Sequence, residues 1–196
     1  MSTFPFTAKK ITVAEGSGFC FGVRRATSKL EERIRSKRQG ERLLTLGSLI
    51  HNEVYNARLK AKGVETVDEE RLYSLAEGAS PDSPVTVFIR AHGITAECES
   101  RLGAIKAQNP SFDFVDCTCP YVKKIHGLAE KHSSEDNFFL LLGHPEHPET
   151  VGIMSRFDGE KFVFSSADEL KRVVSGNTFV KMHNKTFKNI RLILLF

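Results

Sequence analysis

The sequence predicts an α/β fold built from small parallel sheets. Short apolar runs, several of them rich in β-branched residues, alternate with longer segments whose apolar residues recur every three or four positions. This alternation is typical of parallel α/β units. The 196 residues suit one large domain or two small ones, and a content of 40% hydrophobic and 27% charged residues predicts a buried core and not general disorder.

The first predicted domain covers residues 10–110. Its expected strands are the apolar runs at 11–14, 43–46 and 85–89, and its expected helices lie at 22–37, 54–62 and 95–108. In the first helix, Val23, Ala26 and Leu30 share one face. Gly63 follows the second helix as a C-terminal signal, and Thr95 caps the third.

The second predicted domain covers residues 111–180 and repeats this order. Its expected strands lie at 112–115, 138–142 and 162–164, and its expected helices at 121–131, 150–154 and 167–174. The unusual polar residues stand where strands end and helices begin, which is the edge at which parallel sheets bind ligands. Residues 181–196 combine Lys and Asn clusters with a final apolar run, and we expect them to be a separate, aberrant tail.

Charge and hydropathy narrow the functional class. The formal net charge of +4 is spread along the chain, and the basic stretch 33–42 includes Glu41, so we expect no nucleic-acid binding. A mildly basic surface suits a phosphorylated metabolite equally well. No apolar run approaches the ~20 residues that cross a bilayer, and residues 1–10 lack a secretory apolar region. We therefore expect a cytoplasmic protein without a membrane partner.

Four cysteines in a reducing compartment suggest metal binding or catalysis for some of them. Cys20 lies between glycines where a helix begins, a setting that favours a metal ligand or nucleophile, although a buried apolar role is also open. Cys119 precedes Pro120 at another helix start. We expect Cys119 to be the ligand, Cys117 to be incidental, and Cys98 to pack inside its helix.

Three histidines recur in similar places. His51 precedes a helix, and His92 and His147 each follow a strand. Imidazoles in such positions can bind a diphosphate or move protons near neutral pH. Glu149, two residues after His147, is a candidate carboxylate for a proton relay. The histidines without this setting, which we interpret as surface or helix residues, are His126, His132 and His183.

Five segments, in order, resemble motifs of the 4-hydroxy-3-methylbut-2-enyl diphosphate reductase family of the non-mevalonate isoprenoid pathway. They are Gly-Phe-Cys-Phe-Gly-Val-Arg-Arg-Ala (18–26), Ile-His-Asn-Glu-Val (50–54), Arg-Ala-His-Gly-Ile (90–94), Asp-Cys-Thr-Cys-Pro-Tyr-Val-Lys-Lys-Ile-His (116–126) and Gly-His-Pro-Glu-His-Pro-Glu-Thr-Val-Gly (143–152). Cys117 departs from the small residue expected in the fourth motif.

The resemblance implies three similar α/β domains around a central cavity, of which this chain would hold two. Each domain gives one cysteine to a 4Fe–4S cluster, whose remaining iron binds the substrate oxygen, and a donor such as ferredoxin or flavodoxin supplies electrons. The product is a mixture of isopentenyl and dimethylallyl diphosphate. By position, Cys20 and Cys119 resemble cluster ligands, His51, His92 and His147 resemble diphosphate ligands, and Glu149 resembles the catalytic proton donor.

Two departures bear on activity. No cysteine follows Cys119, so the third protein ligand of the cluster is absent from this chain. Asn177 stands where the family has a substrate-contacting threonine, and it becomes the candidate for that contact. We expect a truncated chain that is inactive or very weakly active alone.

Two other functions fit the same residue types. A non-enzymatic remnant would hold zinc with Cys20, Cys119 and nearby histidines, because zinc accepts mixed Cys and His ligands. A hydrolase would use Cys20 as nucleophile with His92 or His147 as base. Iron with acid-labile sulfide favours the reductase, and tightly bound zinc in a colourless protein favours the remnant.

Overall fold

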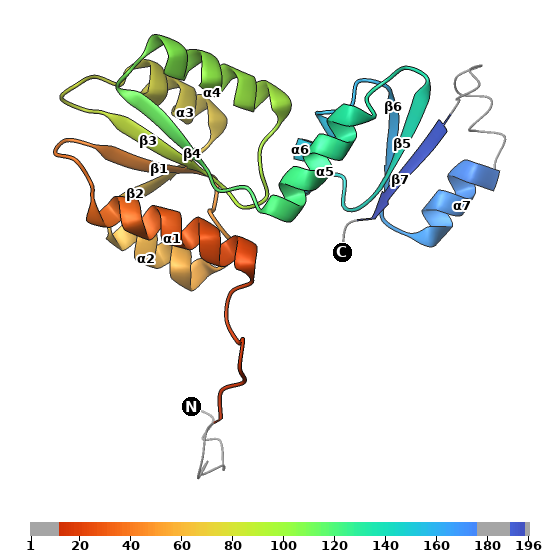
Figure 1. Ribbon diagram of the computed structural model, residues 1–196, viewed down its shortest axis with the longest axis horizontal. Helices are drawn as coiled ribbons and strands as arrows, with labels where there is room; N and C mark the ends of the chain where they lie inside the picture. Colours follow the sequence, from red (N-terminus) through yellow and green to blue (C-terminus); the bar gives the residue numbers. More distant parts are fainter. Residues whose placement is uncertain (1–11, 176–188, 195–196) are drawn as a thin grey trace.

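The computed structural model describes residues 12–175 and 189–194 of the chain. It forms two parallel α/β units (Figure 1). The strands are β1 (Arg42–Leu46), β2 (Val64–Val67), β3 (Val85–Ile89), β4 (Phe112–Asp116), β5 (Asn137–Leu142), β6 (Glu160–Phe164) and β7 (Asn189–Leu194). The helices are α1 (Phe21–Arg35), α2 (Glu53–Ala61), α3 (Glu69–Glu77), α4 (Ala96–Gln108), α5 (Pro120–Lys131), α6 (Pro148–Met154) and α7 (Ala167–Ser175).

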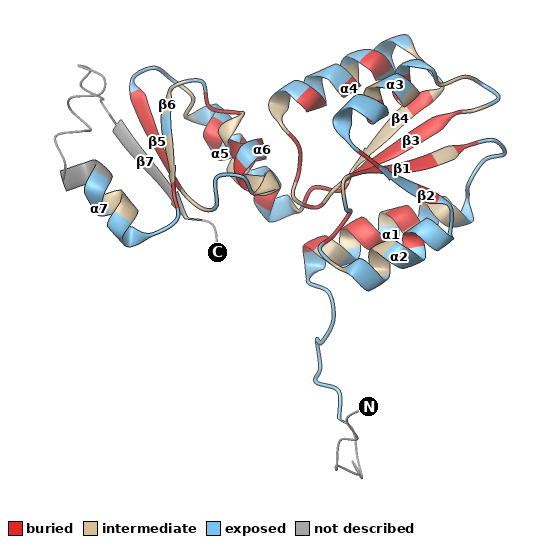
Figure 2. Cartoon of the chain, turned by 180° about the vertical axis from the view of Figure 1, so that it is seen from behind, coloured by how far each residue is buried: buried red, intermediate tan, exposed pale blue. Residues whose placement is uncertain are grey.

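The first unit, residues 21–116, has a four-stranded parallel sheet in the order β2-β1-β3-β4. Helices α1 and α2 cover one face, and α3 and α4 cover the other (Figure 1). Side chains alternate between the faces along each strand. Leu43 and Phe88 pack toward α1 and α2, whereas their neighbours Leu44 and Val87 pack toward α3 and α4. The central strands are therefore buried on both sides (Figure 2).

The second unit, residues 120–194, has a three-stranded parallel sheet in the order β6-β5-β7. Helices α5 and α6 lie on one face and α7 on the other (Figure 1). Phe139 stacks on Phe157 beneath α5 and α6, with ring centroids 4.9 Å apart. Phe138 and Phe164 face α7 through Leu170. This arrangement confirms the predicted class of repeated small parallel-sheet α/β units.

The two units join through a short connection from β4 to α5. The predicted division between residues 110 and 111 falls before β4, but this strand pairs with β3 along residues 112–116 and completes the first sheet. The sequence predicts a separate tail over residues 181–196. Within that range, strand β7 pairs with β5 along residues 189–194 and belongs to the second sheet. The domain boundaries themselves stay predictions.

Three local differences from the sequence prediction are clear. The described residues 12–14 of the expected first strand are irregular and exposed, because they have no neighbouring strand. Helix α3 and strand β2 were not predicted. Strand β2 is short, with exposed Glu65 and Thr66 at its centre, so it lacks an apolar run. Helix α3 buries only Leu72 and Ala76 against the sheet.

No helix in the described ranges, 12–175 and 189–194, combines the length and the apolar character needed to cross a membrane.

Candidate functional site

The candidate site lies where loops leave the carboxyl ends of the strands and enter helices. The loop after β1 leads to His51, and Asn52 then caps α2 by accepting a hydrogen bond from the Tyr55 backbone N–H at 2.8 Å. His92 follows β3, and His147 is the N-cap residue of α6. Parallel sheets collect such loops at one edge, so residues distant in sequence become neighbours.

The three histidines form one group, called here the His cluster: His51, His92 and His147. One ring nitrogen from each lies within 4.8 Å of the other two. The rings of His51 and His92 stack with centroids 4.2 Å apart, and the ring of His147 meets both edge-on, at 5.7 and 5.4 Å. The structure therefore brings together residues separated by up to 96 positions in the sequence.

The surroundings of the His92 ring favour its neutral form. Burial, followed by the neighbouring His51 and His147, lowers the pKa of His92 to about 4. Its ring is therefore neutral at physiological pH. Its Nδ1 atom is buried and has no hydrogen-bond partner among the described residues. A buried polar atom without a partner costs stability, so this position favours a ligand that completes it.

His147 has a defined hydrogen-bond role. Its Nδ1 atom accepts the backbone N–H of Glu149 at 3.3 Å. A neutral imidazole that accepts at Nδ1 carries its proton on Nε2, and it can donate that proton to an oxygen ligand. Burial raises the pKa of the Glu149 carboxyl, although the adjacent His147 opposes the shift. The carboxyl of Glu149 thus keeps a proton to higher pH than an exposed glutamate.

The two candidate thiols stand at the N-termini of α1 and α5. Cys20 is the exposed N-cap residue of α1, and Cys119 is the N-cap residue of α5. Gly22, in the first turn of α1, lies against Cys119: a Cβ atom at Gly22 would stand only 2.5 Å from the Cys119 Sγ atom. The first turn of α1 therefore approaches Cys119 closely because residue 22 has no side chain.

A network of hydrogen bonds holds the loop that carries Cys119. Each bond joins this loop to another element, and the bonds are Arg25 Nη1 to Thr118 O (3.1 Å), Lys29 Nζ to Asp116 O (2.7 Å) and Cys119 N to Ala91 O (2.9 Å). The last bond places Cys119 beside the residue that precedes His92. Cys119 thus lies next to the loop that carries one member of the His cluster.

A cavity of about 180 Å³ lies beside two members of the His cluster. Phe19, next to Cys20 in the chain, lines it together with His51 and His92. The Phe19 ring also meets Tyr55 of α2 edge-on at 6.1 Å. The cavity wall therefore joins the segment before α1 to the His cluster.

The other cysteines and histidines have different surroundings. Cys98 and Cys117 are buried in the cores on opposite faces of the first sheet, as expected for packing residues. Burial raises the pKa of Cys117 to about 11. His126 lies in α5 as expected, but it is buried, not exposed. Asn177 and His183 lie outside the described residues.

The sequence analysis missed Gly22 and the two basic residues of α1 that hold the Cys119 loop, Arg25 and Lys29. The adjacent glycines around Cys20 were a visible signal, because glycine often marks a close approach. The sequence does not reveal that Gly22 meets Cys119, because the two residues are 97 positions apart.

The donor set fits two ligands of an iron–sulfur cluster. Cys20 and Cys119 lie at the N-termini of α1 and α5, and the first turn of α1 approaches Cys119. The other two cysteines of the chain are buried in cores and face away from this surface. The chain thus offers two thiolates to such a group.

Fold and site together define a class: a parallel α/β protein that gathers thiols and imidazoles at helix starts along one edge. A family model described as LytB protein matches residues 11–192. The chain belongs to this family.

Relatives and solved structures agree with that membership. The chain is 30% identical over 182 residues to 4-hydroxy-3-methylbut-2-enyl diphosphate reductase of Caldanaerobacter subterraneus subsp. tengcongensis, covering 89% of this chain and 59% of the relative. It is 35% identical to the reductase of the same name from Campylobacter hominis, covering 92% and 58%. The chain thus spans less than two thirds of the length of these relatives.

A solved structure of (E)-4-hydroxy-3-methyl-but-2-enyl diphosphate reductase superposes with a TM-score of 0.65 at 27% identity, covering 94% of this chain and 66% of that one. The Plasmodium falciparum E-1-hydroxy-2-methyl-but-2-enyl-4-diphosphate reductase gives a TM-score of 0.68 at 20% identity, covering 92% and 49%, and shows likeness of fold alone.

Proposed function

We propose that this chain forms part of a 4-hydroxy-3-methylbut-2-enyl diphosphate reductase of the non-mevalonate isoprenoid pathway. The observation that carries the proposal is the closeness of Cys119 to the His cluster, through the bond from Cys119 N to Ala91 O. The relatives that bear this reductase name support it. The proposed site of action is the cytoplasm, because a reducing compartment keeps thiols available for metal binding.

The His cluster binds the diphosphate end of the substrate in this proposal. Its three imidazoles converge within 4.8 Å, and diphosphate oxygens accept N–H donors. The buried Nδ1 atom of His92 gains a partner when the ligand binds. His147, protonated on Nε2, supplies another donor.

Cys20 and Cys119 provide two ligands of a 4Fe–4S cluster. Both residues stand at helix N-termini, α1 and α5, where the positive ends of the helix dipoles would face an anionic cluster. When bound, a cluster with one iron free of protein ligands supplies electrons and a Lewis-acid position. A one-electron carrier such as ferredoxin or flavodoxin is the partner that suits this chemistry.

Glu149 acts as the proton donor. Its raised pKa, caused by burial, keeps its carboxyl protonated to higher pH than in water. The overall reaction takes up two electrons and two protons, releases the substrate hydroxyl as water, and leaves isopentenyl or dimethylallyl diphosphate. Glu149 delivers one proton to the departing oxygen.

Titration with inorganic diphosphate tests the first step. We expect His92→Ala to weaken binding by about tenfold or more, because a hydrogen bond to a charged group is lost. His144→Ala is the matched control, since His144 is exposed in the loop before α6 and lies outside the His cluster. Equal affinity of both variants and the parent chain would refute diphosphate binding at this cluster.

Anaerobic reconstitution tests the second step. We expect iron and acid-labile sulfide to bind the parent chain and to be lost in Cys20→Ser and Cys119→Ser, but not in Cys98→Ser. Turnover with a reduced dye is expected to be absent or very weak, because the chain offers only two accessible thiolates. Retention of iron by both serine variants would contradict the assignment of the ligands.

A second candidate function is binding of a divalent metal such as zinc. The observation that favours it is the approach of three ring nitrogens within 4.8 Å in the His cluster, because imidazole nitrogens are common zinc ligands. Zinc bound there would survive Cys20→Ser and Cys119→Ser and would be lost in His92→Ala. Metal analysis of these variants separates the two functions.

A further inference from the structure

The loop that carries His92, residues 90–95, is held from the second unit of the protein. Three hydrogen bonds join residues beyond β4 to this loop and to the first residue of α4, which follows it: two come from the second unit and one from Cys119, in the connection between the units. They are Cys119 N to Ala91 O (2.9 Å), Arg156 Nη1 to Ile94 O (3.2 Å) and Ala96 N to Ser155 Oγ (2.9 Å). The position of His92 therefore depends on residues of the second unit as well as on β3.

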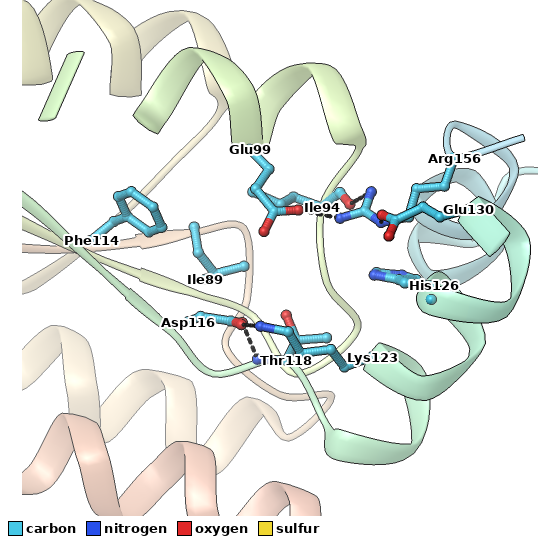
Figure 3. Close-up of a pocket in the computed structure, with 11 residues that line it drawn as sticks. Ile89, Ile94, Glu99, Phe114, Asp116, Thr118, Lys123, His126, Glu130 and Arg156 are labelled. Carbon is cyan, nitrogen blue, oxygen red and sulfur yellow. Dashed lines mark hydrogen bonds and ion pairs between the residues drawn. The ribbon is translucent and has the colours of Figure 1, made fainter. Parts of the chain in front are cut away.

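The side chain of His126 also contacts this loop, by packing. Its residue exposure is 5%, and its ring extends from α5 into the space between the two units (Figure 3). A Cβ atom at Gly93 would lie 2.7 Å from the His126 Cε1 atom, and one at Gly152 would lie 3.4 Å from Nε2. The ring thus occupies the space that the two glycines leave free.

These two glycines belong to the elements that carry the His cluster. Gly93 is next to His92 in the chain and adopts a positive φ of 80°, which favours glycine. Gly152 lies in α6, whose N-cap residue is His147. The His126 ring therefore packs against the backbone next to His92 and also lies near the helix that carries His147, which meets the same loop directly where a Cβ atom at Gly152 would lie 3.1 Å from Ile94 O.

We propose that His126 is a positioning residue that sets the distance between His92 and His147 and thereby the affinity of the His cluster for diphosphate. The effect on affinity rests on the proposed function, whereas the effect on distance does not. A shift of about 1 Å in a binding group is enough to change affinity or rate substantially.

The surroundings of His126 explain why it acts as a spacer and not as a ligand of the His cluster. It does not belong to the group of three converging rings. Burial and the nearby Arg156 lower the pKa of His126 to about 4, which keeps the ring uncharged. Its Nε2 atom is buried and has no hydrogen-bond partner among the described residues, so volume and not bonding defines its contacts.

A cavity of about 250 Å³ borders the ring, so the neighbouring loop would gain space to move if the ring were removed. The cavity is lined by His126, Thr118, Ile94 and Arg156 among others (Figure 3). Removing the imidazole enlarges this space, and the loop at Gly93 loses a wall against which it rests. The loop is then free to move toward α5.

The experiment compares His126→Ala, which removes the spacer, with His126→Phe, which keeps a ring without nitrogens. We measure affinity for inorganic diphosphate by calorimetry, and the contact between the His92 and His147 rings by nuclear Overhauser effects. His126→Ala is expected to weaken diphosphate binding about tenfold and to reduce the contact, whose ring centroids are 5.4 Å apart in the parent. His126→Phe is expected to restore both.

Phe139→Leu is the matched control for a merely structural effect. Phe139 is buried in the second unit beneath α5 and α6, away from the His92 loop. The Phe139→Leu variant is expected to have a lower melting temperature and an unchanged affinity for diphosphate. Weakened binding in this control, or unchanged affinity and ring contact in His126→Ala, would overturn the proposal.

Two further outcomes are decided by the same design. If His126→Ala does not fold, Gly152→Ala is the second variant, because its methyl group would stand 3.1 Å from Ile94 O and 3.4 Å from the His126 ring. An unchanged contact between the His92 and His147 rings in that variant would overturn the proposal. If the parent chain does not bind diphosphate, the proposed function fails. In that case the ring contact alone decides whether His126 sets the spacing.

Discussion

Glu41 carries a buried carboxylate just before β1. Its side chain is 0% exposed and accepts hydrogen bonds from the Thr86 hydroxyl (2.6 Å), the Arg38 backbone N–H (2.9 Å) and the Arg33 guanidinium (2.6 Å). Burial by itself would raise the pKa of Glu41, but these bonds outweigh it and lower the pKa to about 2. The charged carboxylate therefore stabilises the first unit, and its proton binds only in strong acid.

We predict that Glu41→Gln lowers the free energy of unfolding at pH 7 by about 3 kcal/mol. A folded-state pKa below the unfolded value gives stability that is present above about pH 4.5 and is lost as the pH falls toward 2. The difference between variant and parent should shrink over that interval in urea unfolding. Glu65→Gln, at an exposed pair with Arg42, should change little. A difference that stays constant down to pH 3 would contradict the assignment.

At the scale of single elements, helix α4 depends on its first turn. Thr95 accepts the backbone N–H of Cys98 at 3.2 Å, and the helix then buries Cys98, Leu102 and Ile105 against the first sheet. This cap matters for the site because α4 follows directly from the loop that carries His92.

We expect Thr95→Ala to lower the free energy of unfolding by about 1 kcal/mol, because an N-terminal N–H of the helix loses its partner. Thr95→Ser keeps the hydroxyl and should retain most of the stability. Chemical unfolding of both variants checks this. If serine destabilises as much as alanine, the hydroxyl is not the source of the effect.

At the scale of the whole molecule, Arg156 couples the two units. Its side chain is 4% exposed, donates to Ile94 O and forms ion pairs with Glu99 of α4 and Glu130 of α5. A buried guanidinium needs such partners, because an unpaired buried charge is costly. The junction thus has a specific polar link in addition to the chain connection.

Arg156→Met should separate the unfolding of the two units. We expect a loss of about 3 kcal/mol and a calorimetric transition that broadens or splits. Arg101→Met, at an exposed pair with Glu77, is the control and should leave the transition unchanged. A single sharp transition at the parent temperature in Arg156→Met would show that the link does not couple the units.

Much of the fold was predictable because apolar periodicity and capping residues act locally. The four apolar residues of β3 and the spacing of Ala26 and Leu30 in α1 indicated their elements directly. Strand β2 and helix α3 escaped prediction, because a short edge strand and a helix with few buried residues have weak periodicity. The membership of β4 in the first sheet also depends on pairing with β3, a non-local contact.

By itself the sequence determined the α/β class and the residue types that stand where strands meet helices, since both follow from neighbours in the chain. Only the tertiary structure decided which of these residues meet. It brought His51, His92 and His147 within 4.8 Å, placed Gly22 against the Cys119 thiol, and buried His126 between Gly93 and Gly152. These distances depend on how two sheets and their helices pack across nearly a hundred residues, and local periodicity carries no information about them.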